Sequence, residues 1–317
     1  MTVAVVVVNW NSGALLQECL KGLSVQTVMP QRVLVVDNAS SDDSAACVGH
    51  FPGATLLQMT TNLGFAAGNN RALAECDTEF VALLNPDAFP EPDWLERLLA
   101  AASSYPNVAA FGSRQLRQDS PEVLDGIGDS YHMSGLVSRE RHGARQQEGD
   151  LVSREIFSPC AAAALYRRQA LVDVGGFDED YFCYVEDVDL GFRLRLAGHR
   201  AMYVPDAVVH HVGSATTGGQ RSDFSVYHGH RNLVWTFVKN MPGALFWLLL
   251  PLHLLMNLAM VGVFVIRGQG GAQAAYPHAQ LVHVLGTDAI QTLLHPDTHQ
   301  RLQATAQASP VQGRHRD

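Results

Sequence analysis

Short apolar runs alternate with amphipathic stretches over the first hundred residues. The runs are rich in β-branched residues, as is typical of buried strands, and they lie at 3–8, 33–36, 54–59 and 80–84. After the first run, Leu16, Leu20 and Leu23 are spaced four and then three residues apart, which predicts a helix capped by Ser12. Further helices are predicted at 65–75 and 91–102. This alternation predicts an α/β fold with an open, mostly parallel Rossmann-like sheet and helices on both faces.

The pattern changes after these elements. Residues 114–158 are polar and rich in Gly, Ser and Arg, with little periodicity, so we expect loops or a hairpin near a site. A regular apolar pattern resumes at 161–166. A helix is predicted from near Glu186 to about Ala197, because Gly198 follows in the position that favours glycine after a last turn. Val208 and Val209 indicate one more strand.

A long uncharged stretch lies towards the end of the sequence. Residues 243–266 contain no Asp, Glu, Lys or Arg, and the stretch exceeds the ~18 apolar residues expected of a membrane-span candidate. Pro251, His253 and Asn257 interrupt it, which fits a kinked or half-inserted helix as well as a span. We expect this segment to associate with a membrane. A buried core helix or a dimer interface is the alternative.

Composition limits the class of protein. A chain with 47% hydrophobic and 17% charged residues is expected to fold. The formal net charge is −9 and no basic stripe occurs, so no nucleic-acid partner is expected. Five cysteines at irregular spacing, without a Cys-x-x-Cys pair, predict reduced thiols in a cytosolic compartment.

Polar residues directly follow three of the predicted strands. Ligands of parallel sheets bind at the carboxyl ends of the strands, which groups Asn9, Asp37 and Asn85-Pro86-Asp87 on one rim. A carboxylate such as Asp37 can accept a hydrogen bond from a base or a ribose, although an ordinary turn with a helix cap explains it equally well. Asp87 with the Asn85 amide offers the oxygen ligands that a hard divalent cation needs. A plain Asn-Pro turn is the alternative.

The segment from Asn62 to Asn70 opens a predicted helix. Small residues such as Gly64 allow a ligand to approach the backbone, and the amides at a helix N-terminus suit a diphosphate. Its glycine spacing is not that of a dinucleotide-binding loop, and a tight loop–helix junction is an equally good interpretation.

An acidic cluster and two histidines complete the candidate chemistry. Glu186, Asp187 and Asp189 lie within four residues at a predicted helix start, where the helix dipole favours carboxylates. Asp189 lies four residues before Arg193, a helical ion pair, so another carboxylate of the cluster remains for a general base. His210 and His211 follow a predicted strand, and histidine is a common metal ligand, although packed or surface histidines are more frequent.

Six segments, in this order, resemble the family 2 glycosyltransferases and, within them, the bacterial rhamnosyltransferase-like members. They are Val-Val-Asn-Trp-Asn at 7–11, Val-Val-Asp-Asn-Ala-Ser at 35–40, Asn-Leu-Gly-Phe-Ala-Ala-Gly-Asn-Asn at 62–70, Leu-Leu-Asn-Pro-Asp at 83–87, Gly-Gly-Phe-Asp-Glu at 175–179 and Tyr-Val-Glu-Asp-Val-Asp-Leu at 184–190. The resemblance spans residues 3–240. It implies a GT-A fold, with a nucleotide-binding half followed by an acceptor half.

The resemblance also implies a role for each candidate on the donor side. Asn9 and Asp37 would contact the nucleoside, whereas Asn62, Gly64 and Asn70 would lie beside the donor. These residues form the expected nucleotide-sugar-binding set, together with Asn85.

The remaining candidates would hold the cation and carry the chemistry. Asp87 would bind Mg²⁺ or Mn²⁺, although Asn85 stands at the first acidic position of the family's metal motif. His211 resembles the family's histidine that contacts the metal or the diphosphate, and His210 is the weaker candidate. Asp187 matches the family's catalytic base, with Glu186 beside it.

The expected organisation follows from these assignments. Residues 1–112 form the nucleotide-sugar-binding half, 113–240 the acceptor-binding and catalytic half, 241–267 the membrane-associating segment, and 268–317 a tail of unassigned role. The resemblance implies an inverting transfer, with dTDP-rhamnose as the first donor candidate and a glycan or lipid-linked acceptor of cell-surface polysaccharide synthesis. We expect it in the cytoplasm, at the inner face of the cell membrane.

Two other functions remain open from the sequence. A sugar-nucleotidyltransferase would need a basic, glycine-rich loop near the N-terminus, and residues 9–13 contain no Lys or Arg. A non-catalytic, membrane-docked sugar-binding protein would not need the acidic cluster at 186–189. An assay of sugar transfer from a nucleotide sugar distinguishes the three functions.

Overall fold

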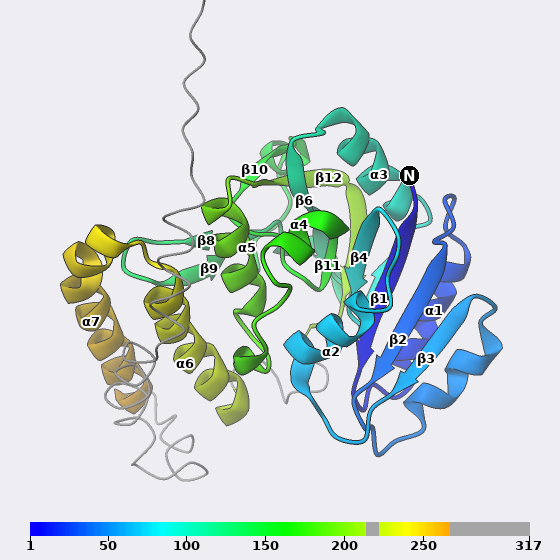
Figure 1. Cartoon of the computed structure of the whole chain (residues 1–317), viewed down its shortest axis with the longest axis horizontal. Helices are drawn as coiled ribbons and strands as arrows, with labels where there is room; N and C mark the ends of the chain where they lie inside the picture. Colours follow the sequence, from blue (N-terminus) through cyan, green and yellow to red (C-terminus); the bar gives the residue numbers. More distant parts are fainter. Residues whose placement is uncertain (214–221, 267–317) are drawn as a thin grey trace, which may run out of the picture. The chain divides into compact units, whose positions relative to one another are not determined.

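The structure of the protein is a computed structural model, and it describes residues 1–213 and 222–266 (Figure 1). The expected tail at 268–317 lies outside these residues. The chain divides into two compact units. The first unit contains Met1–His132 and Val137–Asn232. The second contains Met133–Leu136 and the described residues from Leu233 onwards.

A mixed sheet forms the centre of the first unit (Figure 1). Its strands follow the order β10-β12-β6-β11-β4-β1-β2-β3, with β5 paired to β12 and β7 paired to β6. The strands are β1 (Val3–Asn9), β2 (Arg32–Asp37), β3 (Ala54–Gln58), β4 (Phe80–Leu84), β5 (Ala88–Pro90), β6 (Val108–Arg117), β7 (Ser120–Gly126), β10 (Arg154–Ile156), β11 (Ala163–Arg167) and β12 (Arg200–His211). All four strands predicted near the N-terminus are present, and they pair in parallel.

One strand near the middle of the sheet is reversed. β11 pairs antiparallel with both β4 and β6, whereas β12 pairs parallel with β6. The strands β1, β2, β3, β4, β6 and β12 therefore all run in one direction. The expected boundary at 112/113 falls within β6, so both expected halves contribute to one sheet.

Helices and short 3-10 turns connect the strands. They are α1 (Leu15–Ser24), η1 (Ser44–His50), α2 (Gly64–Leu73), α3 (Trp94–Ser104), η2 (Glu148–Leu151), α4 (Arg168–Asp173), η3 (Glu179–Tyr181) and α5 (Glu186–Leu196). Odd-numbered valines of β1 pack with α1 residues such as Leu16, and even-numbered positions pack with α2 residues such as Ala66. The uniform burial of β1 follows from this cover on both faces.

The predicted helix ends differ in outcome. The Ser12 hydroxyl donates to the side chain of Asn9, and α1 begins after Ala14 without a side-chain cap among the described residues, so the predicted cap is wrong. At the end of α5, the prediction is confirmed. Gly198 has φ +86°, its N–H donates to the Arg195 carbonyl at 2.9 Å, and the next amide reaches the Leu194 carbonyl, also at 2.9 Å.

The polar region at 114–158 is more regular than expected. The β6–β7 hairpin extends the main sheet, and β8 (Asp129–Tyr131) pairs antiparallel with β9 (Val137–Arg139). The expected hairpin is therefore present, and strands make up 20 of the 45 residues of this region. Strands in this region are short or partly exposed, and such strands accept polar side chains, which explains why the apolar alternation is missing.

Two helices account for most of the second unit. α6 (Asp223–Asn240) begins in the first unit and ends in the second, and α7 (Gly243–Ile266) continues through Pro251 without a break. His253 Nδ1 donates to the Ser134 carbonyl at 2.8 Å, and Asn257 donates to the His253 carbonyl at 2.8 Å. The polar residues of α7 are therefore buried, whereas large apolar residues such as Trp247 and Leu248 are exposed.

By length and composition, α7 is a membrane-span candidate. Its stretch Gly243–Val263 has a mean hydropathy of 2.0, and no other helix of the described residues passes the same test.

Candidate active site

The predicted rim exists at one edge of the sheet. β1, β2, β4 and β12 all end there, and reversed β11 begins there, with Ala163 opposite Leu84 (Figure 1). Asn9, Asp37, Asp87 and His211 therefore share one edge, although they are far apart in the sequence. Such an edge is where ligands of open α/β sheets bind.

Asn9 and Asp37 form a buried polar pair. Asn9 lies opposite Asp37 in register, and its Nδ2 donates to Asp37 Oδ1 at 2.7 Å. Asp37 also accepts from the backbone amide of Ser40 at 3.2 Å and from the side chain of Gln58. Asn9 therefore orients Asp37. Contact of these residues with a nucleoside stays a prediction.

The segment 62–66 is occupied by protein contacts. Asn62 Oδ1 accepts from the Gly64 amide at 2.9 Å, and the amides of Phe65 and Ala66 donate to the Phe182 carbonyl at 2.6 and 3.2 Å. The expected use of these helix-start amides for a diphosphate is thus wrong for this structure, because another carbonyl already satisfies them. Gly64 is needed for a different reason: its φ is +84°, and a Cβ there would lie 2.5 Å from the Phe182 carbonyl oxygen.

Asn70 connects α2 to the segment that precedes η3. Its Nδ2 donates to the Phe177 carbonyl and its Oδ1 accepts from the Phe177 amide, both at 2.8 Å. Its expected position beside the donor stays a prediction.

Asp87 and His211 lie within hydrogen-bonding distance of each other. His211 Nε2 lies 3.2 Å from Asp87 Oδ1, and its Nδ1 donates to Asp125 Oδ2 at 2.9 Å. Burial lowers the pKa of His211, but the hydrogen bonds and charges of Asp125 and Asp87 outweigh burial and raise it to about 9. His210 points to the other face of β12, where its Nε2 lies 2.9 Å from Glu91.

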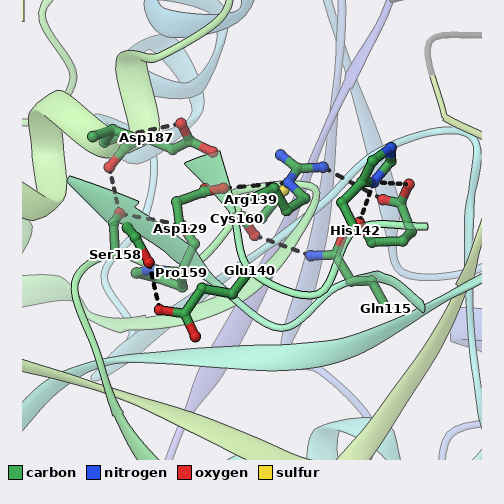
Figure 2. A network of polar contacts seen from close by, with 12 residues as sticks. Gln115, Asp129, Arg139, Glu140, His142, Ser158, Pro159, Cys160 and Asp187 are labelled. Carbon is green, nitrogen blue, oxygen red and sulfur yellow. Dashed lines mark hydrogen bonds and ion pairs between the residues drawn. The ribbon is translucent and has the colours of Figure 1, made fainter. Parts of the chain in front are cut away.

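An arginine links this group to a second acidic group. Arg139 lies 3.4 Å from Asp125 Oδ2 and 3.3 Å from Asp129 Oδ1, and Figure 2 shows it between Asp129 and His142. Asp129 Oδ2 is buried and has no hydrogen-bond partner among the described residues. Burial raises the pKa of Asp129 to about 7; Arg139 opposes the rise and Asp187 adds to it.

Asp125, Asp129 and Arg139 were not among the predicted site residues, because they lie in the region expected to form loops or a hairpin. One local pattern could have indicated them: the sequence at 125–129 is Asp-Gly-Ile-Gly-Asp, in which two acidic residues enclose two glycines.

The three carboxylates at the start of α5 have different environments. Asp189 pairs with Arg193 at 2.7 Å, which confirms the predicted ion pair, and it also accepts from the Tyr181 hydroxyl at 3.2 Å. Burial raises the pKa of Glu186 well above its ordinary value, and the neighbouring charge of Asp187 adds to this. Asp187 Oδ2 accepts from the Ala161 amide at 3.1 Å, just before β11. Asp187 therefore lies at the rim.

The turn before α5 is conformationally strained. Positive φ values occur at Phe182 (63°), Tyr184 (67°) and Val185 (67°), none of which is glycine. Asn232 holds this turn, because its Nδ2 donates to the carbonyls of Tyr181, Cys183 and Tyr184 at 3.0, 2.9 and 2.7 Å. The middle of α6 thus fixes the segment that presents Asp187.

Two groups of residues have side chains suited to a metal ion. Asp87 and His211 supply oxygen and nitrogen, and the nearby Asn85 Oδ1 is buried without a partner among the described residues. Asp129, Cys160 and Asp187 each place one ligand-type atom within 4.8 Å of the others. That second group includes a thiol whose pKa is raised by burial, and thiols select softer metals than Mg²⁺ or Mn²⁺. The first group is therefore the better fit to a hard divalent cation.

Comparisons with known proteins show the family and the fold. The family model "Glycosyltransferase like family 2" matches residues 1–232. The N-acetylglucosaminyl-diphospho-decaprenol L-rhamnosyltransferase of Mycobacterium tuberculosis is 32% identical over 255 residues, which cover 71% of this chain and 80% of that protein. An O-antigen chain rhamnosyltransferase of Salmonella typhimurium is 24% identical over 233 residues, covering 72% of this chain and 70% of that one.

Solved glycosyltransferases share the fold. A mannosyltransferase from Pyrobaculum calidifontis, in complex with GDP-Man and Mn²⁺, superposes with a TM-score of 0.57 at 21% identity and covers 96% of this chain and 84% of that one. TarS 1–349 of S. aureus, in complex with UDP-GlcNAc, gives a TM-score of 0.59 at 19% identity, with 95% and 84% coverage. The expected GT-A fold is confirmed, and the chain belongs to the family 2 glycosyltransferases.

Proposed function

We propose that the protein is an inverting glycosyltransferase that transfers a sugar from a nucleoside-diphosphate donor to a glycan or lipid-linked acceptor. The observation that carries the proposal is the approach of His211 Nε2 to within 3.2 Å of Asp87 Oδ1, across 124 residues of sequence and on the rim that also holds Asp187. Rhamnose from dTDP-rhamnose is the first donor candidate, because two relatives are named rhamnosyltransferases.

Asp187 is the proposed general base. In this mechanism its carboxylate takes the proton of an acceptor hydroxyl while the oxygen attacks the anomeric carbon. Attack from the face opposite the diphosphate inverts that carbon, and the diphosphate leaves with the bonding electron pair. Asp189 is less suited to this role, because Arg193 and Tyr181 already occupy its carboxylate.

Asp87 and His211 would hold Mg²⁺ or Mn²⁺, and Asn9, Asp37 and Asn85 would contact the donor. A bound divalent cation supplies positive charge that stabilises a leaving diphosphate. Two of the solved structures that share the fold contain Mn²⁺ together with UDP or GDP-Man.

The exposed apolar surface of α7 supports association with a membrane. Trp247, Leu248 and Leu255 are exposed, while His253 and Asn257 are buried. A helix that faces water exposes its polar residues and buries its apolar ones. α7 shows the opposite arrangement, which suits contact with lipid. We propose that the protein acts at the inner face of the cell membrane in cell-surface polysaccharide synthesis, where a lipid-linked acceptor would meet a cytosolic donor.

The direct test is donor binding followed by transfer. The melting temperature of the full chain should rise with one of UDP, dTDP and GDP, and it should rise further with Mn²⁺ or Mg²⁺, because ligands that bind only the folded state stabilise it. Sugar transfer from the matching nucleotide sugar should stop in EDTA and return with added cation. Full transfer in EDTA would rule out the metal role, and an absence of nucleotide binding would rule out the activity.

A further inference from the structure

Asp125 is a buried carboxylate behind the candidate cation site. Its Oδ2 accepts from His211 Nδ1 at 2.9 Å, and His211 Nε2 is directed at Asp87. Asp125 is 5% exposed and His211 is also 5% exposed, so water cannot replace this bond easily. The pair joins side chains 86 residues apart in the sequence.

A β-bulge orients this carboxylate. In the pairing of β6 with β7, Gln115 lies opposite Gly126 and the next residue, Leu116, lies opposite Leu124. Asp125 is therefore the extra residue of β7, without a partner in the register. Bulges redirect a side chain and are common beside active sites.

Further contacts fix Asp125. Arg139 lies 3.4 Å from its Oδ2, and His142 Nδ1 lies 3.5 Å from its Oδ1 and donates to its backbone carbonyl at 2.6 Å. The backbone carbonyl and the carboxylate of Asp125 are thus both held, as in a pre-organised site.

We propose that Asp125 is a positioning residue for the divalent cation, acting through His211. A hydrogen bond from Nδ1 to a carboxylate fixes the imidazole tautomer that keeps the proton on Nδ1 and leaves the Nε2 lone pair for a metal. It also makes the imidazole a stronger ligand. This inference rests on the proposed cation site at Asp87 and His211.

Asp125 supplies a negative charge near a metal motif that has only one carboxylate of its own. Asn85 stands where a second acidic ligand is expected, so Asp87 is the only carboxylate in that motif. The Asp125 carboxylate at Nδ1 makes the neutral His211 imidazole a better electron donor at Nε2. It does so without occupying a coordination position of the cation.

The test measures Mn²⁺ binding to the full chain, from the electron paramagnetic resonance signal of free Mn²⁺, for wild type, Asp125→Asn and Asp125→Ala. Loss of such a partner typically weakens metal affinity about 10–100-fold, and we expect a Kd increase in that range for both variants. Asp150→Asn is the matched control, because Asp150 is also buried and ion-paired, with Arg141 at 3.0 Å, but has no contact with His211. Its Kd should equal that of wild type.

The variant Asp87→Ala distinguishes a failure of the Asp125 role from a failure of the proposed cation site. Lost Mn²⁺ binding in Asp87→Ala, with a wild-type Kd in folded Asp125→Asn, would overturn the role of Asp125 alone. A wild-type Kd in Asp87→Ala would instead overturn the cation site and the inference with it.

A measurement on the unmutated protein does not depend on how the variants fold. In ¹⁵N-histidine spectra of the Mg²⁺-loaded chain, the His211 signal, identified by its loss in His211→Gln, should show a proton on Nδ1. A proton on Nε2 instead would overturn the inference.

Discussion

Three carboxylates lie in the first turn of α5, and their partners give them different chemistry. Asp189 is engaged by Arg193 and Tyr181. Burial makes the Glu186 carboxyl hard to ionise. The Asp187 carboxylate accepts from two backbone amides, that of Val188 and that of Ala161 just before β11, and the second bond places it at the rim.

Replacing Asp187 by Asn keeps the shape and removes the proton acceptor. We expect kcat to fall by a factor of ~10²–10⁴, the usual contribution of a general base, with donor affinity unchanged. The matched change Asp189→Asn should lower the melting temperature, because it breaks the buried pair with Arg193. Steady-state kinetics and donor titration of both variants check this. Near-normal turnover in Asp187→Asn would assign the base elsewhere.

Asp129 should make stability depend on pH. Its pKa of about 7 in the folded state lies above its ordinary value of 3.8, so folding takes up a proton between these values. The resulting stabilisation is complete below about pH 4 and is lost as the pH rises through about 7.

Asp129→Asn removes this titration. Between pH 5 and pH 8, the melting temperature of the variant should therefore fall less than that of wild type. Asp77→Asn, at an exposed carboxylate, should behave as wild type does. Parallel curves for wild type and Asp129→Asn would contradict the raised pKa.

At the residue scale, the sequence predicted the groups that directly follow strands or start a helix. Local patterns offered Asp87, the two histidines at 210–211 and the acidic cluster at 186–189, and the resemblance to the family then selected His211 and Asp187. The structure brings Asp87 and His211 together. Asp125 and Arg139 were missed, because their importance comes from contacts with residues distant in sequence or across a bulge. No local pattern reports such contacts.

At the scale of elements, α2 depends on the turn before α5. The Phe182 carbonyl caps the first amides of α2, and Gly64 lets it approach. Gly64→Ala would combine an unfavourable φ with a backbone clash, which should cost about 2 kcal/mol or more and lower the melting temperature by about 4–8 °C.

Gly49→Ala is the control for this change. No described atom lies within 4 Å of the added carbon at Gly49, so the melting temperature should stay within about 1–2 °C of wild type. Calorimetry of both variants makes the comparison. An unchanged melting temperature in Gly64→Ala would mean that the turn moves away without cost.

The strands near the N-terminus and the end of α5 were predictable, because apolar runs and a glycine after a last turn are local signals. The Ser12 cap failed for a local reason as well. Its hydroxyl has a buried acceptor in Asn9, and that bond replaces the cap. A cap requires the hydroxyl oxygen to accept from an amide of the first turn, and spacing alone does not show that the hydroxyl is oriented toward Asn9 instead.

For the whole molecule, membrane association should depend on the exposed face of α7. A full chain carrying Trp247→Ser, Leu248→Ser and Leu255→Ser should shift from the membrane to the soluble fraction, because these side chains are exposed. Fractionation without detergent measures the shift.

The same number of changes at exposed polar positions, Gln17→Ser, Gln31→Ser and Gln118→Ser, provides a control that should leave the distribution unchanged. An unaltered distribution of the α7 variant would assign the exposed face to a contact other than lipid.

The order of strands could not be predicted from the sequence. The reversal of β11 and the length of β12 depend on pairing between distant segments. The residues Met133–Leu136 belong to the second unit although the chain around them belongs to the first, which no composition shift indicates.

Warming should affect the turn at 182–185 before it affects the sheet. Three residues there hold positive φ at a cost of about 1–3 kcal/mol each, and the carbonyls of Tyr181, Cys183 and Tyr184 share one donor, the side-chain amide of Asn232. Local segments of this kind open at lower free energy than a buried sheet. The rate of sugar transfer should therefore reach its maximum several degrees below the melting temperature, and cooling should restore it.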